Sequence, residues 1–331
     1  MRILILADLE GISGVGDYRC LIPAGSIYKE ACENLTHDIN SAVQGLRTAG
    51  ASEIDVVDSH STVWPTRKGP RNIIKDKIDP RIRKIMGGWD MLELTRSDPE
   101  ALKSYDAQVI VGEHAMAGTS DGFVSQTHSD NTALRMNNQY VGEIEWQTWL
   151  LGHYDVPTIM VTGDAAAIRE TKTFFPEIVG VIVKTAKSRG KAECLPPDEA
   201  RKMIEEVATK ALSNLRKFRP HRLCPPIKLD LIFDSSEPTR FGSYMPGAKQ
   251  TDDRTVTYIA EDYPEAIWAH MSLVMLGTLH ALTQDIGKLF ELLPEKSRKK
   301  FNDETVEKIS KWATEPSTFL STEPPKNRES K

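Results

Sequence analysis

The chain has 331 residues, of which 40% are hydrophobic and 27% are charged, and its formal net charge at pH 7 is −5. This composition is typical of a globular protein and excludes a fibrous or wholly disordered chain. Basic and acidic residues are interspersed, so the chain offers no strong field for a phosphate backbone, and we expect no nucleic-acid partner.

Strand-like and helix-like segments alternate along the first two-thirds of the chain, which predicts a mostly parallel sheet flanked by helices. The clearest buried strands are RILILA at 2–7, EIDVVD at 53–58, AQVIVG at 107–112 and PTIMVTG at 157–163. Apolar residues at helical spacing predict a crossover helix over about residues 26–49, ending at Gly50.

Asp164 is a suitable N-cap for a helix that begins AAAIRETKTFF, and a fifth strand, IVGVIVK, follows at 178–184. Later segments predict a helix at 198–217, strands at 228–234 and 254–260, and a helix at 264–282. We therefore expect an α/β domain over residues 1–190, a smaller C-terminal α+β domain over 191–283 and an extension over 284–331. The end of this extension is too polar to offset its ordering entropy, so we expect a partly disordered tail.

Carboxylates and imidazoles follow three of the predicted strands. In an open α/β sheet, ligands bind at the carboxyl ends of the strands. Asp8 and Glu10 end the first strand, and because strand side chains alternate, both face the same side. The second strand is followed by His60 and the third by His114, so two imidazoles are expected at the same edge.

Two carboxylates in one small volume repel each other unless a cation lies between them. Mixed oxygen and nitrogen ligands suit zinc, manganese, cobalt or iron better than calcium or magnesium. A single acidic residue after a strand is usually a helix cap, and we interpret Asp164 in that way. Three strand ends that carry ligand types together predict a metal site within the first domain.

Short motifs around these residues resemble the D-aminopeptidase family of zinc metallopeptidases. The motifs are ADLEGISG at 7–14, DSHS at 58–61, GEHA at 112–115 and VGEI at 141–144. Further matches are YDVP at 154–157, TGD at 162–164 and MPGA at 245–248, so the resemblance covers about residues 1–283.

The resemblance implies that two Zn²⁺ ions, with Mn²⁺ or Co²⁺ as alternatives, are bound by Asp8, Glu10, His60, His114 and Glu143. Asp8 would bridge the two ions. The assignment of Glu143 as a ligand rests on the resemblance alone, because an acidic residue at the start of an apolar helix is favourable in any case. A two-metal centre would supply a bound water of lowered pKa, polarise the scissile carbonyl and hold the substrate amine.

The sequence departs from the family at one catalytic position. The family has a further histidine, assigned as nucleophile or base, and the segment FVSQTHS at 123–129 places Gln126 there. Glutamine is neither a base nor an effective nucleophile. His128 lies two residues on and would face the same way on an extended segment, so it could take over the role or contact the ligands or the substrate.

The predicted function is hydrolysis of amide bonds in short peptides, by an aminopeptidase with a preference for a D-residue at the amino end. One alternative is a metal-dependent amidase that acts on a small non-peptide amide. A second is a catalytically silent metal- or peptide-binding protein, although a pocket that only binds would not need all five ligand candidates.

The resemblance also implies a homo-oligomer, with a ring whose active sites face a channel as the expected form. The N-terminal apolar run turns acidic at Asp8, which is too early for a secretory signal. No segment approaches the roughly 18–20 apolar residues of a membrane-spanning helix. We therefore expect a cytoplasmic protein that has no contact with a membrane.

Overall fold

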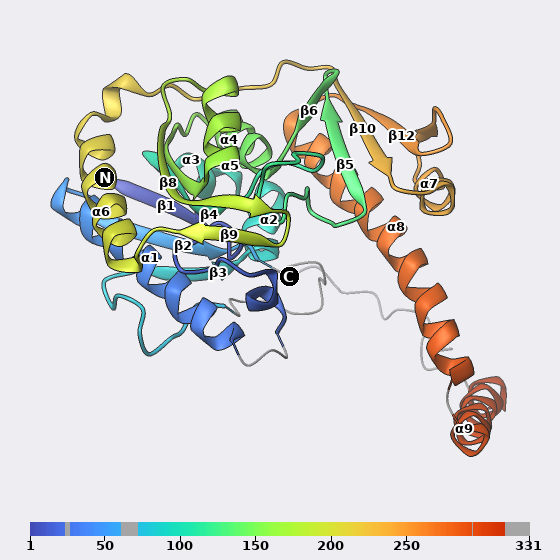
Figure 1. The fold of residues 1–331 in the computed structure, drawn as a ribbon. Helices are drawn as coiled ribbons and strands as arrows, with labels where there is room; N and C mark the ends of the chain where they lie inside the picture. Colours follow the sequence, from blue (N-terminus) through green and yellow to red (C-terminus); the bar gives the residue numbers. More distant parts are fainter. Residues whose placement is uncertain (24–26, 61–71, 293, 315–331) are drawn as a thin grey trace, which may run out of the picture. The chain divides into compact units, whose positions relative to one another are not determined.

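The computed structural model describes residues 1–23, 27–60, 72–292 and 294–314 (Figure 1). Residues Met1–Gly277 form one compact unit and Thr278–Lys331 form a second. Among the described residues, no helix is long and apolar enough to cross a membrane.

The larger sheet has seven strands in the order β3-β2-β1-β4-β7-β8-β9. These strands are β1 (Arg2–Ala7), β2 (Glu53–Asp58), β3 (Lys84–Gly87), β4 (Ala107–Glu113), β7 (Thr158–Asp164), β8 (Val179–Ser188) and β9 (Lys191–Cys194). Neighbours are parallel from β3 to β8, and only β9 pairs antiparallel, with β8. The carboxyl ends of β1, β2 and β4 therefore lie side by side.

Helices cover both faces of this sheet. They include α1 (Tyr28–Thr48), α2 (Gly88–Ser97), α3 (Pro99–Lys103), α4 (Glu143–His153), α5 (Ala165–Phe174) and α6 (Pro197–Ser213), with short 3-10 turns at Tyr18–Leu21 and Leu215–Lys217. Along β1, Ile3 and Ile5 join the core under α1 and α6, whereas Leu4 and Leu6 join the core under α2, α4 and α5. Figure 1 shows α4 and α5 on one side of the strands and α1 on the other.

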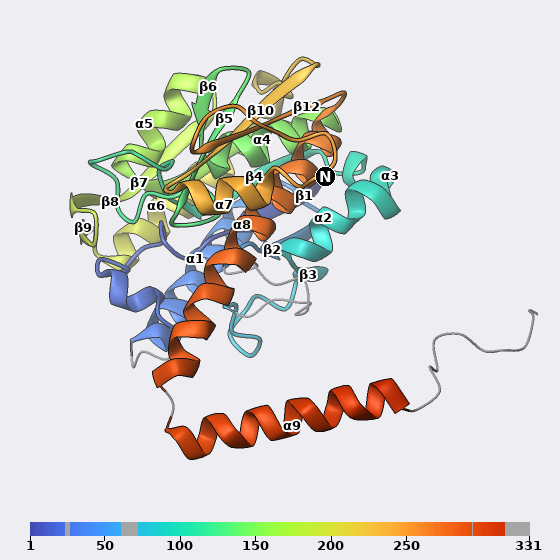
Figure 2. The same cartoon turned by 90° about the vertical axis from the view of Figure 1, so that its right-hand side faces the viewer.

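The second sheet is antiparallel and has five strands in the order β11-β12-β10-β5-β6. They are β5 (Thr132–Met136), β6 (Gln139–Val141), β10 (Ile227–Phe233), β11 (Lys249–Gln250) and β12 (Thr255–Ala260). In Figure 2 these strands lie together, next to α7 (Ser236–Gly242). The chain continues with α8 (Tyr263–Leu292) and α9 (Glu295–Thr314).

The predicted fold class is confirmed, since a mostly parallel sheet is flanked by helices and an antiparallel sheet accompanies it. The domain boundary at residue 190 stays a prediction; the structure adds that the second sheet combines strands from both sides of it. Sequence analysis missed the short elements and also α9, in which Lys300 and Glu304 pair one turn apart. The predicted tail at 315–331 lies outside the described residues.

A bulge at Gly112 brings the ends of β1 and β4 into backbone contact. The register of β4 against β7 shifts between Ile110 and Glu113, and Gly112 has φ 83°. A Cβ atom on Gly112 would lie 2.3 Å from the carbonyl oxygen of Asp8. Only glycine therefore combines this backbone conformation with this approach.

Replacing Gly112 with alanine is expected to destabilise the protein far more than replacing Gly118. Both glycines have positive φ, 83° and 92°, but a Cβ on Gly118 would meet nothing within 4 Å. The comparison isolates the effect of the contact between residue 112 and the carbonyl oxygen of Asp8. We expect this contact to lower the free energy of unfolding by about 1–3 kcal/mol beyond the effect of the backbone conformation. Chemical denaturation of the two variants measures it, and equal losses would contradict the tight contact.

Candidate metal centre

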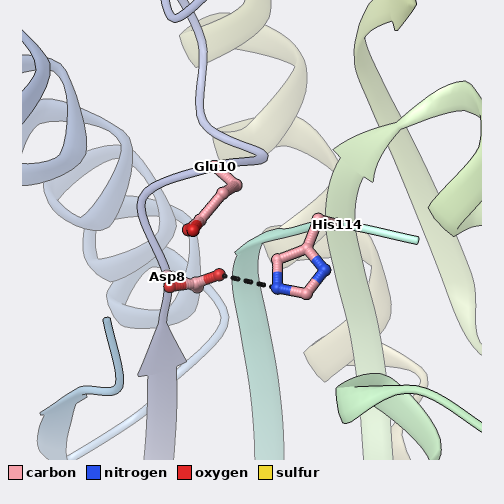
Figure 3. Close-up of side chains that lie close together, drawn as sticks. All are labelled: Asp8, Glu10 and His114. Carbon is pink, nitrogen blue, oxygen red and sulfur yellow. Dashed lines mark ion pairs between the residues drawn. The ribbon is translucent and has the colours of Figure 1, made fainter. Parts of the chain in front are cut away.

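The carboxyl ends of β1, β2 and β4 gather the residues that the sequence placed there. Backbone hydrogen bonds hold the segments together, from Asp8 N to Val111 O at 2.9 Å and from Ser59 N to Ala7 O at 2.9 Å. Figure 3 shows Asp8 and Glu10 on the segment after β1, with the carboxylate of Asp8 directed at His114 at the end of β4.

Asp8 lies between the two predicted histidines. Its Oδ1 is 3.1 Å from His60 Nδ1, and its Oδ2 is 3.5 Å from His114 Nε2, the contact drawn in Figure 3. Glu10 Oε2 lies 2.8 Å from His60 Nδ1, and Glu143 Oε1 lies 3.3 Å from His114 Nε2. The structure thus brings all five predicted ligands into one cluster, in which each oxygen of Asp8 faces a different imidazole.

Burial makes this cluster electrostatically costly. Asp8, Glu10, His60 and His114 are each at most 8% exposed. Burial, with the neighbouring Glu10 carboxylate, raises the pKa of Asp8 to about 7. Burial alone would also raise the pKa of Glu10, but the His60 imidazole beside it holds that pKa well below its usual range.

The second half of the cluster behaves in the same way. Burial opposes the charged imidazolium of His114, but the carboxylate of Glu143 nevertheless raises the pKa of His114 well above its usual value. Burial likewise opposes ionisation of Glu143, and His128 and His114 lower its pKa to about 2. Burial thus disfavours each charged group of the cluster, and a neighbour of opposite charge offsets that cost.

The orientation of His114 fits a cation between the carboxylates. Its Nδ1 lies 3.0 Å from the carbonyl oxygen of Ala115 and donates to it, so in the neutral imidazole that a metal ion would bind the lone pair is on Nε2, which faces Asp8 and Glu143. Nε2 is buried and has no hydrogen-bond partner within the described part of the chain. An imidazole whose far nitrogen donates to a carbonyl is a typical metal ligand, and the mixed donor set fits zinc.

Two further side chains, Lys184 and Asn72, fix the segments that carry these ligands. Lys184 is buried and donates from Nζ to the carbonyl oxygens of Glu10 and Val15, each at 2.6 Å. Asn72 donates from Nδ2 to a carboxylate oxygen of Asp58 at 2.9 Å and to the carbonyl oxygen of His60 at 3.2 Å. The loop after β1 and the start of the loop after β2 are thus held from behind.

Gln126 and His128 both reach the cluster, but at different carboxylates. Gln126 donates from Nε2 to Glu10 Oε1 at 3.2 Å. The backbone nitrogen of His128 donates to Glu143 Oε1 at 2.8 Å, and its Nε2 lies 3.8 Å from Glu143 Oε2. The extended backbone expected for this segment is wrong, because His128 has φ 58°, in the left-handed region. The side chains of Gln126 and His128 therefore do not occupy the same position.

The His128 ring is held by aromatic neighbours. Its centroid lies 4.9 Å from the ring of Trp146 and 4.8 Å from that of His270. Trp146 donates from Nε1 to His270 Nδ1 at 3.1 Å. Burial lowers the pKa of His128. The ring is therefore fixed next to Glu143 rather than free to rotate in solvent.

Sequence reasoning missed one carboxylate of the cluster, Glu113. One of its carboxylate oxygens lies within 4.8 Å of a ring nitrogen of His114 and of a carboxylate oxygen of Glu143. Alternation along a regular strand would turn Glu113 away from His114, so only the bulge at Gly112 could have revealed it. The cap interpretation of Asp164 is confirmed, since its carboxylate accepts from Ala167 N at 2.9 Å.

Comparisons with known proteins show which family this chain resembles. A family model described as D-aminopeptidase matches residues 1–272. A curated D-aminopeptidase of Bacillus subtilis (strain 168) is 28% identical over 283 residues, which cover 84% of this chain and 98% of that protein. A solved structure, described as the Zn-dependent D-aminopeptidase DppA from Bacillus subtilis, a self-compartmentalizing protease, aligns with a TM-score of 0.75 and 26% identity. The alignment covers 84% of this chain and 98% of that chain.

Proposed function

The chain belongs to the D-aminopeptidase family, and from this premise we propose that it is a zinc-dependent aminopeptidase that acts on short peptides. The observation that carries the proposal is the position of Asp8, whose two carboxylate oxygens face His60 and His114 separately. A carboxylate shared in this way is the arrangement that a two-metal centre requires.

Two zinc ions would divide the cluster between them. Asp8, Glu10 and His60 would hold one ion, and Asp8, His114 and Glu143 would hold the other. When bound, such a centre supplies a water of lowered pKa and polarises the scissile carbonyl. The donor set would also accept Mn²⁺ or Co²⁺.

The remaining polar residues position the cluster and serve proton transfer. Gln126 donates to Glu10 and so fixes the orientation of that carboxylate. His128 is held by Glu143 through its backbone nitrogen, with its Nε2 atom 3.8 Å from Glu143 Oε2. We infer that His128 is the acid–base group of this chain and accepts a proton at a ring nitrogen during amide cleavage.

A D-residue at the amino end is the proposed substrate preference, since the similar Bacillus subtilis protein is described as a D-aminopeptidase. We expect the zinc-loaded protein to release amine from D-alanyl dipeptides faster than from L-alanyl dipeptides. A chromogenic assay of the two series measures this preference. Equal rates would remove the stereochemical preference and leave the peptidase assignment standing.

A metal-dependent amidase for small non-peptide amides is the second candidate. It is favoured by the resemblance, which implies that Gln126 stands where the family has its further histidine. Including small amides in the same assay separates the two functions, because an amidase would hydrolyse them and leave both dipeptide series intact.

We also propose that the chain assembles into a homo-oligomer, with a ring as the expected form, because the similar solved structure is described as self-compartmentalizing. In a ring, enclosed active sites would admit only short, flexible substrates. Native mass spectrometry of the full chain tests the assembly. A cytoplasmic location stays a prediction.

A further inference from the structure

Glu113 carries a buried oxygen that nothing in the described chain satisfies. Glu113 is 1% exposed, and its Oε2 has no hydrogen-bond partner among the described residues. The other oxygen, Oε1, accepts from Gln147 Nε2 at 2.6 Å. Leaving a buried carboxylate oxygen unpaired is costly, so its position calls for a partner that the protein chain does not provide.

The backbone places the Glu113 carboxylate in the proposed metal centre. Glu113 and His114 are consecutive at the end of β4, and on a regular strand their side chains would point to opposite faces. The bulge at Gly112, where the register against β7 shifts, turns both toward Glu143. The ligand atoms of Glu113, His114 and Glu143 consequently lie within 4.8 Å of one another.

The contact with Gln147 has the form of a support for a ligand. Gln147 lies one turn after Glu143 on α4 and is itself 3% exposed. It fixes Oε1 of Glu113, and Oε2 is left without a hydrogen-bond partner among the described residues. Carboxylates that bind metal ions are typically oriented in this way by a second hydrogen-bonding residue.

The charge of the cluster points in the same direction. Asp8, Glu10 and Glu143 contribute three carboxylates around His114, and Glu113 adds a fourth. Two divalent cations carry four positive charges and balance four carboxylates, with both histidines neutral. Buried charges are stable only when they are paired in this way.

We propose that Glu113 is a further zinc ligand, which binds through Oε2 on the side of the centre that holds His114 and Glu143. This inference rests on the proposed function, since it requires a zinc centre. It adds a sixth residue to the five that the resemblance supplies, and it makes Gln147 a positioning residue for that ligand.

The test is zinc affinity of the full-length protein, measured by competition with a chromophoric chelator. The wild type is expected to bind two zinc ions per chain. Glu113→Gln is expected to bind one of them at least about 10-fold more weakly. The matched control is Glu145→Gln, because Glu145 is equally buried and also has one bonded and one unpaired oxygen. Unlike Glu113, it is not grouped with His114 and Glu143 among the described residues. We expect the control to bind both ions as the wild type does.

A second readout is independent of activity. The visible spectrum of the Co²⁺-substituted protein, which reports on the ligands of the ion, should change in Glu113→Gln and stay the same in Glu145→Gln. If Glu113→Gln does not fold, Gln147→Met carries the test, and it should also weaken one zinc ion by about 10-fold. Wild-type affinity for both ions in the folded variant would overturn the proposal.

The two hypotheses fail in different ways. If the wild type itself binds no zinc, the proposed zinc centre is wrong, and so is the proposal that Glu113 is one of its ligands. If the wild type binds two zinc ions and hydrolyses peptides while Glu113→Gln binds both ions equally well, only the sixth ligand is wrong.

Discussion

Replacement of Asp8 by asparagine is expected to lower kcat/KM by about 10⁴-fold or more, which is within the range expected when a metal-activated water is lost. The variant should also lose at least one of its two zinc ions. The reason is geometric: each oxygen of Asp8 faces a different imidazole, and a neutral amide cannot bridge two cations. Zinc content by mass spectrometry and steady-state kinetics of the purified variant measure the two effects.

The matched control for this variant is Asp230→Asn. Asp230 is 1% exposed, but it pairs with Arg135 in the antiparallel sheet. This variant is expected to lose stability while it keeps its zinc content and most of its activity. A zinc content of two and a wild-type rate in Asp8→Asn would show that the bridging role of Asp8 is wrong.

Replacement of His128 by alanine is expected to lower kcat by at least about 100-fold, the usual scale for the loss of an acid–base group. Zinc content should be unchanged, because the hydrogen bond to Glu143 comes from the backbone nitrogen of residue 128. Steady-state kinetics of the zinc-loaded variant, together with its zinc content, test both expectations.

His153→Ala is the matched control, since His153 lies at the end of α4 with its ring against Tyr154. Its kinetics should match those of the wild type. Unchanged turnover in His128→Ala would exclude His128 from the mechanism. It would also favour the amidase alternative. In that case the histidine expected from the family resemblance would be replaced by Gln126, and no other residue would take over its role.

Much of the fold was predictable because its long strands are apolar and bounded by turns. The predicted strands at 2–7 and 53–58 coincide with β1 and β2. The short strands β5 and β6 were missed although they form a hairpin across Asn137 and Asn138, whose positive φ values mark a local turn. The pairing of β5 with β10, about a hundred residues later, leaves no local signal.

The residues of the candidate site also differ in whether the sequence could predict them. Asp8, Glu10, His60 and His114 could be placed from the sequence, because the carboxyl ends of adjacent parallel strands meet at one edge. Glu143 came only from the resemblance, since it reaches the cluster from the start of a helix. Glu113 could not be found, because its direction depends on a bulge that β4 forms against another strand.

The position of His128 shows a second limit of pattern reasoning. Alternation along an extended segment would place Gln126 and His128 on the same side. The backbone at His128 instead adopts φ 58°, and its ring packs against Trp146, a residue of α4. A loop conformation set by such a tertiary contact cannot be derived from spacing.

Titration of the metal-free protein with Zn²⁺, with amine release from a D-alanyl dipeptide recorded at each step, is the most direct test of a two-zinc peptidase. We predict that the rate rises until two equivalents per chain are bound and then stays constant, and that His60→Ala gives no release at any zinc concentration. Full activity in the chelator-treated protein, or wild-type activity in His60→Ala, would contradict the account.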